Sequence, residues 1–192
     1  MTGHDNDQAE GFRESGTHAG PRAAARAGGA REVGEESGAV RILVLLGSAS
    51  DLSVTEGMEA LCQRLGLTMR IEVASAHRQP DLLRRLVQEA EKAGTEVFVA
   101  VAGMAAHLPG VVASLTARPV VGVPVAAGPL AGVDALLSIV QMPPGVPVAT
   151  VAVGKAGARN AVVLAARMIA LYDGEVAKAL DAYRRDLARG GK

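Results

Sequence analysis

Three short stretches hold the side chains best suited to chemistry, and each follows an apolar run. The first, "SAHRQP" at residues 75–80, places His77 beside Arg78. A histidine can take and give a proton near neutral pH, and an arginine can clamp a phosphate or a carboxylate. The same residues also fit a histidine packed against a helix start and an arginine on the surface. The stretch alone leaves both interpretations open.

The second stretch, "GSASD" at residues 47–51, has the composition of an anion site. Gly47 permits a tight turn, while Ser48 and Ser50 offer hydroxyl groups. A helix that begins here would add free N–H groups and the positive end of its dipole, which suit phosphate. Asp51 would repel phosphate, so it either caps the helix or accepts hydrogen bonds from ribose hydroxyls.

The third stretch, "AGMAAHLPG" at residues 102–110, contains the other histidine of the ordered-looking region, His107. Its small residues let the backbone approach a ligand closely. His107 could bind that ligand or fix the loop. Two histidines at the ends of neighbouring strands favour a shared site over two unrelated core residues.

The elements that position these stretches alternate between strand and helix. Strands buried on both faces lack polar alternation, and five apolar runs have this character. The pattern predicts an α/β fold with an open parallel sheet and helices on both faces. Ligands then bind at the carboxyl ends of the strands, where all three stretches lie. The runs cover residues 40–51, 69–80, 96–110, 118–129 and 146–157, and the helical patterns cover 51–66, 80–94, 108–117, 132–142 and 158–188.

Several helix boundaries are marked in the sequence. Pro80 is expected at the first position of the second helix, and Gly94 just beyond its end. The pattern over residues 158–188 is expected to break near Asp173 and Gly174. In the first helical pattern, one apolar face consists of Val54, Met58, Leu61 and Leu65.

The composition limits the class of protein. The chain has 192 residues, with 20 basic and 20 acidic side chains, which argues against a nucleic-acid surface. Hydrophobic residues make up 49% and aromatic residues 2%, without tryptophan, so an aliphatic core is expected. Cys62, the single cysteine, is expected to be a small buried side chain in a protein of the reducing cytoplasm. No membrane helix and no signal peptide are predicted.

The chain is expected to have three parts. Residues 1–40, with His4 and His18, are predicted to be a disordered, solvated N-terminal extension. Residues 41–172 are expected to form the α/β domain that carries the three stretches, and residues 173–192 a helix that packs on its own or a neighbouring subunit. The sequence has no nucleotide-binding glycine motif and no metal-binding motif. Lys155 is interpreted as structural or interfacial rather than as a Schiff-base lysine.

Over residues 41–185 the sequence closely resembles the bacterial-type (class I) PurE family, the N5-carboxyaminoimidazole ribonucleotide mutases. The resemblance rests on "GSASD", "SAHRQP", "AGMAAHLPG", "PVVGVPV", "GVDALLSIVQMPPGVPVATVAVGKAG" and "NAVVLAA", in this order. It implies a flavodoxin-like three-layer αβα domain and a homo-octamer with sites at subunit contacts. It implies no cofactor and no metal, and functional coupling to the ATP-dependent synthase that makes the carboxyamino substrate.

By position, the resemblance makes His77 the general acid and base. Ser48, Asp51 and Arg78 match the residues that bind the phosphate and ribose of the substrate, next to Gly47. The residues that match the loops around the reacting carboxylate are Ser75, Ala76, Ala105, Ala106, His107 and Leu108. Protonated His77 would donate to the exocyclic nitrogen as CO2 departs, and neutral His77 would then remove the proton from ring carbon C4.

The sequence departs from the family pattern at a few positions. Val101 and Met104 stand where the family loop usually has glycine, and Arg159 stands where a smaller residue is common. These changes leave the acid/base residue in place but affect the loop around the expected CO2 pocket. Two other functions are kept open. One is direct carboxylation with free CO2, or decarboxylation by a paralogue, and the other is a nucleotide-binding module without catalysis.

Overall fold

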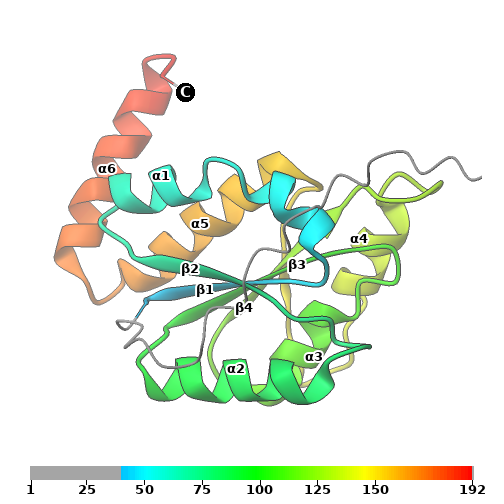
Figure 1. Cartoon of the computed structure of the whole chain (residues 1–192). Coiled ribbons are helices and arrows are strands. Elements are labelled where there is room, and N and C mark those ends of the chain that lie inside the picture. Colours follow the sequence, from blue (N-terminus) through cyan, green and yellow to red (C-terminus); the bar gives the residue numbers. More distant parts are fainter. Residues whose placement is uncertain (1–39, 192) are drawn as a thin grey trace, which may run out of the picture. The chain divides into compact units, whose positions relative to one another are not determined.

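Five parallel strands form one sheet in the computed structural model, which describes residues 40–191 (Figure 1). The strand order β2-β1-β3-β4-β5 is that of flavodoxin-like folds. The predicted open parallel sheet is therefore confirmed. The strands are β1 (Ile42–Leu46), β2 (Met69–Val73), β3 (Val97–Gly103), β4 (Val120–Val125) and β5 (Ala149–Thr150). The expectations for residues 1–39, including His4 and His18, lie outside the described residues.

Helices cover both faces of the sheet, because side chains of the central strands point alternately to the two sides. On β1, Ile42, Val44 and Leu46 belong to one apolar cluster, while Leu43 and Leu45 belong to the other. The first cluster packs under the 3-10 helix η1 (Ala49–Thr55) and the helices α1 (Met58–Arg64), α5 (Lys155–Ile169) and α6 (Gly174–Ala188). The second packs under α2 (Pro80–Lys92), α3 (Leu108–Leu115) and α4 (Val133–Val140). Figure 1 shows both layers.

The marked helix ends agree with the structure, but the first helical pattern does not form one helix. Pro80 opens α2, and Gly94 follows its end with a φ of 99°. The single helix expected over residues 51–66 is wrong, since Gly57 has a φ of 83° and separates η1 from α1. This left-handed conformation ends any helix, and glycine adopts it without steric cost.

The fifth strand is much shorter than its apolar run predicts. It pairs with β4 only at Ala149 and Thr150. Pro147, just before it, has no N–H to donate to the ladder, and Gly154, after it, turns the chain into α5 with a φ of 74°. Helix α5 therefore begins at Lys155, three residues earlier than the pattern predicts.

Helix α6 is fixed to the rest of the described chain at both ends. Asp173 caps its N-terminus by accepting hydrogen bonds from the backbone N–H groups of Glu175 and Val176. Asp173 also accepts a hydrogen bond of 2.6 Å from Arg41, whose guanidinium pairs with Glu96 as well. This guanidinium, together with the cap, lowers the pKa of the Asp173 carboxyl. Further along, Tyr183 is buried, and the Arg64 guanidinium lies 5.0 Å from its ring centroid.

Two further predictions concern Cys62 and membranes. The Cys62 thiol is free and fully buried in α1, and burial raises its pKa to about 12. It is thus the small apolar core residue that the sequence indicates. Within residues 40–191, no helix is both long and apolar enough to cross a bilayer.

Candidate active site

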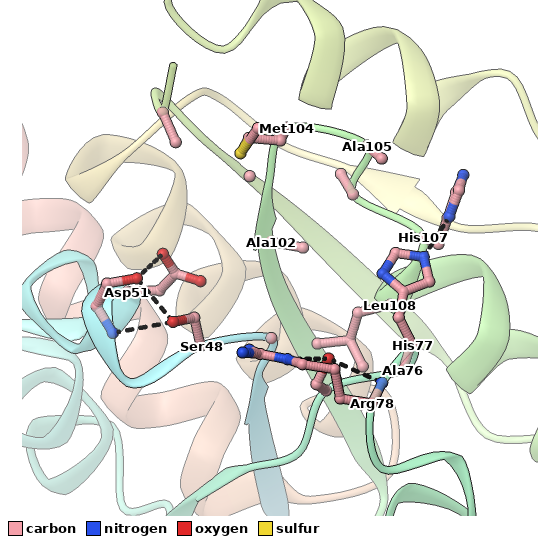
Figure 2. Close-up of a pocket in the computed structure, with 16 residues that line it drawn as sticks. Ser48, Asp51, Ala76, His77, Arg78, Ala102, Met104, Ala105, His107 and Leu108 are labelled. Atoms are coloured by element: carbon pink, nitrogen blue, oxygen red, sulfur yellow. Dashed lines mark hydrogen bonds between the residues drawn. The ribbon is translucent and has the colours of Figure 1, made fainter. Parts of the chain in front are cut away.

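The loops that follow β1, β2 and β3 meet around one cavity of about 470 Å³ at the carboxyl edge of the sheet (Figure 2). The chain leaves β1 toward β2 on one side and later returns to β3 on the other. The cavity therefore lies at the point where the strand order reverses, which is where open α/β sheets bind ligands. Its size is in the range of small-molecule sites.

Every site residue predicted from the sequence lines this cavity. They are Gly47, Ser48, Asp51, Ser75, Ala76, His77, Arg78, Ala105, Ala106, His107 and Leu108. The wall also contains Ser50, Ala102, Gly103, Met104 and Ala127. Ala127 comes from the segment after β4 and was not among the predicted residues. The signal that could have found it is the end of the fourth apolar run, which reaches the same edge of the sheet.

The first loop forms a compact hydroxyl and carboxylate cluster. The Ser48 hydroxyl oxygen accepts a hydrogen bond from the backbone N–H of Ser50 and thereby caps η1. The Ser50 hydroxyl lies 2.8 Å from that of Ser48 and 3.3 Å from a carboxylate oxygen of Asp51. Asp51 is only 8% exposed, and its burial raises the pKa of the carboxyl despite this hydrogen bond. The sequence left two roles open for Asp51, capping the helix or accepting hydrogen bonds from ribose hydroxyls. The side chain that caps η1 is that of Ser48.

The second loop presents a guanidinium that has no acidic partner in the described part of the chain. The backbone N–H and the Nε of Arg78 both donate to the hydroxyl of Ser75, each over 3.3 Å. Ser75 is itself buried, and its carbonyl accepts from the N–H of Gln79. Among the ion pairs of residues 40–191, none involves Arg78. A cation fixed by a neutral hydroxyl at a cavity wall is suited to bind an anionic ligand.

The two histidines form a direct pair across the second and third loops. The Nε2 of His77 lies 2.6 Å from the Nδ1 of His107, and their rings meet edge to face with centroids 4.8 Å apart. One nitrogen must donate the proton that the other accepts, so the tautomers of the two rings are coupled. Figure 2 shows this pair on the same side of the cavity as Leu108. The expectation that the two histidines follow neighbouring strands is wrong, because β1 lies between β2 and β3, yet the two loops bring the rings into contact.

The third loop has a strained backbone. Met104 and Ala106 have φ angles of 55° and 41°, in the left-handed region that favours glycine. A turn closes between them, with the N–H of Ala106 donating to the carbonyl of Gly103 over 3.1 Å. Non-glycine residues in this region cluster at ligand sites in proteins generally. Apart from Met104, the residues of this loop between Gly103 and His107 are alanines.

Two other candidate groups are not part of the cavity. Lys155 does not line it, and its ammonium pairs with the Glu56 carboxylate over 2.5 Å. This agrees with a structural role for the lysine. In the part of the chain that the structure describes, no group of three or more histidine, cysteine, aspartate or glutamate side chains is arranged to hold a metal ion.

Comparisons with known proteins identify the family of this chain. The family model described as AIR carboxylase matches residues 41–190. The N5-carboxyaminoimidazole ribonucleotide mutase of Methanocaldococcus jannaschii is 47% identical over 148 residues, 77% of this chain and 90% of that protein. The enzyme of the same name from Pseudomonas aeruginosa is 50% identical over 141 residues, which cover 73% of this chain and 86% of that protein.

A solved structure gives the same result for the fold. The crystal structure of Treponema denticola PurE superimposes with a TM-score of 0.71 and 27% identity, covering 78% of this chain and 92% of that one. The fold and cavity thus define a flavodoxin-like α/β protein with a small-molecule site at the carboxyl edge of its sheet. Since the family model spans residues 41–190, the chain belongs to the AIR carboxylase family.

Proposed function

We propose that this protein is an N5-carboxyaminoimidazole ribonucleotide mutase, as its relatives are named. It is an isomerase of purine (IMP) biosynthesis that moves CO2 from the exocyclic N5 of the substrate to ring carbon C4. The product is 4-carboxy-5-aminoimidazole ribonucleotide. The observation that carries the proposal is the convergence of His77, Arg78 and the Ser48 loop on one cavity in a chain of this family.

The anionic end of the substrate is assigned to the first two loops. Arg78 would bind the phosphate with its guanidinium, which has no acidic partner among the described residues and is oriented by the buried hydroxyl of Ser75. The Ser48 and Ser50 hydroxyls lie at the start of η1 and can donate to the same group. Asp51 would accept hydrogen bonds from the ribose hydroxyls of the substrate. Its buried carboxylate has few hydrogen-bond donors in the free protein, and these hydroxyls would supply them.

His77 then moves one proton in each direction. As the bond between N5 and the carbamate carbon breaks, protonated His77 donates a proton to N5, and CO2 is released beside the neutral amine. Ring carbon C4, made electron-rich by the amine, attacks CO2 and forms the new C–C bond. Neutral His77 removes the C4 proton and returns to its starting state. One histidine suffices because it donates one proton to N5 and later accepts one proton from C4, so it ends the cycle protonated as it began.

The remaining loop residues surround the migrating carboxyl group. Ala76, Ala105, Ala106 and Leu108 line the cavity with small or apolar side chains. Such a lining excludes water, which would hydrate CO2 or carry it away. His107 would fix the ring of His77 in the free enzyme through their hydrogen bond.

We further propose that the protein assembles as a homo-octamer with sites at subunit contacts. Four apolar side chains on and just before α4, at least half exposed, support such a contact: Leu130, Val133, Leu137 and Val140. The first of them, Leu130, comes three positions after Ala127 of the cavity wall. We place the enzyme in the cytoplasm, where a free Cys62 thiol stays reduced, and functionally next to the ATP-dependent synthase that supplies its unstable carbamate substrate.

The test is turnover of the purified protein with N5-carboxyaminoimidazole ribonucleotide in the absence of ATP. We expect conversion to the C4-carboxy isomer. The variant His77→Asn should lose about 10²- to 10⁴-fold in rate, since general acid/base catalysis contributes that much. An unchanged rate for His77→Asn would contradict the mechanism.

The same assay separates the two other functions. Faster turnover from aminoimidazole ribonucleotide plus bicarbonate than from the carbamate would identify a direct carboxylase. Tight binding of substrate without turnover would identify a binding module. Arg78→Lys distinguishes binding from chemistry, because a lysine keeps the charge but loses the bidentate guanidinium geometry. It should raise KM more than it lowers kcat.

A further inference from the structure

Met104 differs from every other apolar residue in the cavity wall. The wall has two large apolar side chains, Leu108 and Met104. Leu108 is 2% exposed and belongs to the buried core, whereas Met104 is 58% exposed. The neighbours of Met104 in the loop, Gly103 and Ala105, have little or no side chain. Met104 is thus the single large and freely exposed apolar group among the described residues of this wall.

The backbone directs this side chain toward the segment after β4. With a φ of 55°, Met104 is held in the left-handed region. A Cβ on Gly103 would lie only 3.0 Å from the Cβ of Ala127, so this glycine lets the end of β3 approach the segment after β4 closely. A Cβ on Gly128 would lie 3.9 Å from the Cγ of Met104, so the Met104 side chain lies against Gly128, next to Ala127 of the cavity wall. Figure 2 shows Met104 at the end of β3, with Arg78 on the opposite side of the view.

We propose that Met104 closes over the bound ribonucleotide and retains the released CO2, so that it sets the ratio of carboxyl transfer to CO2 loss. This inference rests on the proposed mutase function. CO2 has no charge and no net dipole, so neither Arg78 nor the serine hydroxyls can hold it firmly. It must instead be enclosed, and an apolar, flexible thioether is a suitable cover because it adapts to irregular gaps.

Retention affects only the middle of the reaction. Before it, the N5–carbon bond has broken and His77 has given its proton to N5. After it, C4 bonds to the same CO2 and His77 recovers a proton. If CO2 leaves between these steps, the products are free aminoimidazole ribonucleotide and dissolved CO2. The ratio of C4-carboxy product to free aminoimidazole ribonucleotide therefore measures how well CO2 is retained, separately from the acid/base chemistry of His77.

The experiment follows the carbon through the reaction. The substrate carries ¹³C in its carbamate, and the buffer contains unlabelled bicarbonate with carbonic anhydrase, so that any CO2 that escapes is diluted. Mass spectrometry measures ¹³C in the C4-carboxy product and the amount of aminoimidazole ribonucleotide released. His77→Asn serves as the blank for spontaneous decarboxylation.

Four variants separate the side chain from the backbone strain. Met104→Ala removes the thioether but keeps a Cβ in the left-handed region, and Met104→Gly removes both. We expect each to increase label loss per turnover by about tenfold, the factor for removing one well-placed apolar group. Met104→Leu keeps an apolar cover and should stay near the parent protein. Met104→Gln matches methionine in length but binds water, so it should lose label like Met104→Ala.

The outcomes distinguish this inference from the proposed function. If the parent protein gives no C4-carboxy product at all, the mutase function is wrong. If it turns over and Met104→Ala and Met104→Gln retain label as well as the parent does, the assignment to Met104 is overturned. Loss of label by Met104→Gly alone would also overturn it, since loop flexibility rather than the thioether would then control retention. Circular dichroism shows whether each variant is folded. If Met104→Ala does not fold, Met104→Gln alone decides whether the thioether retains CO2.

Discussion

At the scale of single residues, the hydrogen bond between His77 and His107 is the most informative contact of the cavity. In the free protein it occupies Nε2 of His77. A substrate that needs this nitrogen must displace the ring of His107, whereas a substrate that uses Nδ1 leaves the pair intact. In both cases His107 contacts His77 before any ligand arrives, so we expect it to orient the proposed acid/base group.

A double-mutant cycle tests this orienting role. His107→Asn should lower kcat by about tenfold and leave KM nearly unchanged, because it loses an orienting contact rather than the proton carrier. The double variant His77→Asn/His107→Asn should be no slower than His77→Asn alone, since residues that act as a unit are non-additive. Additive losses measured by steady-state kinetics would mean that His107 acts on the substrate independently of His77.

Sequence patterns predict the residues of the site better than their contacts. His77 and His107 could be placed at one edge of the sheet because both follow buried strands. Their direct contact could not be predicted, because the distance between the two rings depends on the position of β1 between β2 and β3. The left-handed backbone of Met104 and Ala106 was equally hidden, since neither residue type favours it. Ala127 carries no chemistry of its own, so only geometry shows it in the wall.

At the scale of elements, the start of α5 depends on a glycine. A Cβ on Gly157 would lie 1.6 Å from the carbonyl oxygen of Ala152, a distance that no relaxation of side chains can relieve. Gly157→Ala should therefore lower the free energy of unfolding by about 2–4 kcal/mol, the range for severe overpacking. Urea denaturation followed by circular dichroism measures this loss.

Gly174 is the matched control for that substitution. It also lies in the first turn of a helix, α6, but no atom would come within 4 Å of an added Cβ. Gly174→Ala should leave stability nearly unchanged or slightly higher, since alanine is the better helix former. Equal losses for the two variants would show that the close approach at Gly157 does not limit stability.

The attachment of α6 should depend on pH through Asp173. Its pKa is lowered in the folded state, chiefly by the hydrogen bond from Arg41, below an ordinary value of 3.8. The folded protein then binds fewer protons than the unfolded chain in this range. The contribution to stability is therefore present above about pH 4 and is lost as pH falls through the folded pKa.

Asp173→Asn tests this dependence, because asparagine can still cap α6 but cannot pair with Arg41. Its melting temperature should lie below that of the parent at pH 7, and the two should converge as pH falls below about 4. Glu175→Gln in the same helix is the control, because among residues 40–191 the Glu175 carboxylate forms an ion pair with Lys178 and with no other residue. This variant should show no such convergence. A difference between Asp173→Asn and the parent that is constant from pH 7 to pH 3 would rule out the ion pair as its source.

Elements were predictable where burial dictates composition. The first four apolar runs became strands because the helical layers cover both faces of the sheet. The two errors have local causes that burial does not reveal. Gly57 could have stood inside a helix, and its left-handed conformation is what divides η1 from α1. The run before α5 is apolar throughout, yet only two of its residues pair with β4.

At the scale of the whole molecule, the apolar residues of α4 should determine assembly. Four exposed apolar side chains on one short segment are more than a monomer needs, and such patches mark contacts. If the proposed octamer forms through this segment, Leu137→Asp should convert it to smaller species, which light scattering after gel filtration would detect. Turnover should fall with it, because the proposed sites lie at subunit contacts.

Leu171→Asp is the control for that experiment. Leu171 is 86% exposed at the turn between α5 and α6, outside the α4 segment. It should leave both the assembly and the activity unchanged. A protein that is monomeric before any substitution, with full activity, would contradict both the octamer and the placement of the sites.

The scarcity of aromatic residues has a practical consequence for optical measurements. The sequence has no tryptophan and two tyrosines, Tyr172 just before α6 and Tyr183 within it. Tyr172 is exposed, whereas Tyr183 is buried beneath the Arg64 guanidinium. Intrinsic fluorescence of the described domain therefore comes from one helix and its N-terminal turn. It reports when α6 detaches, while the cavity on the far edge of the sheet stays optically silent and free for substrate absorbance.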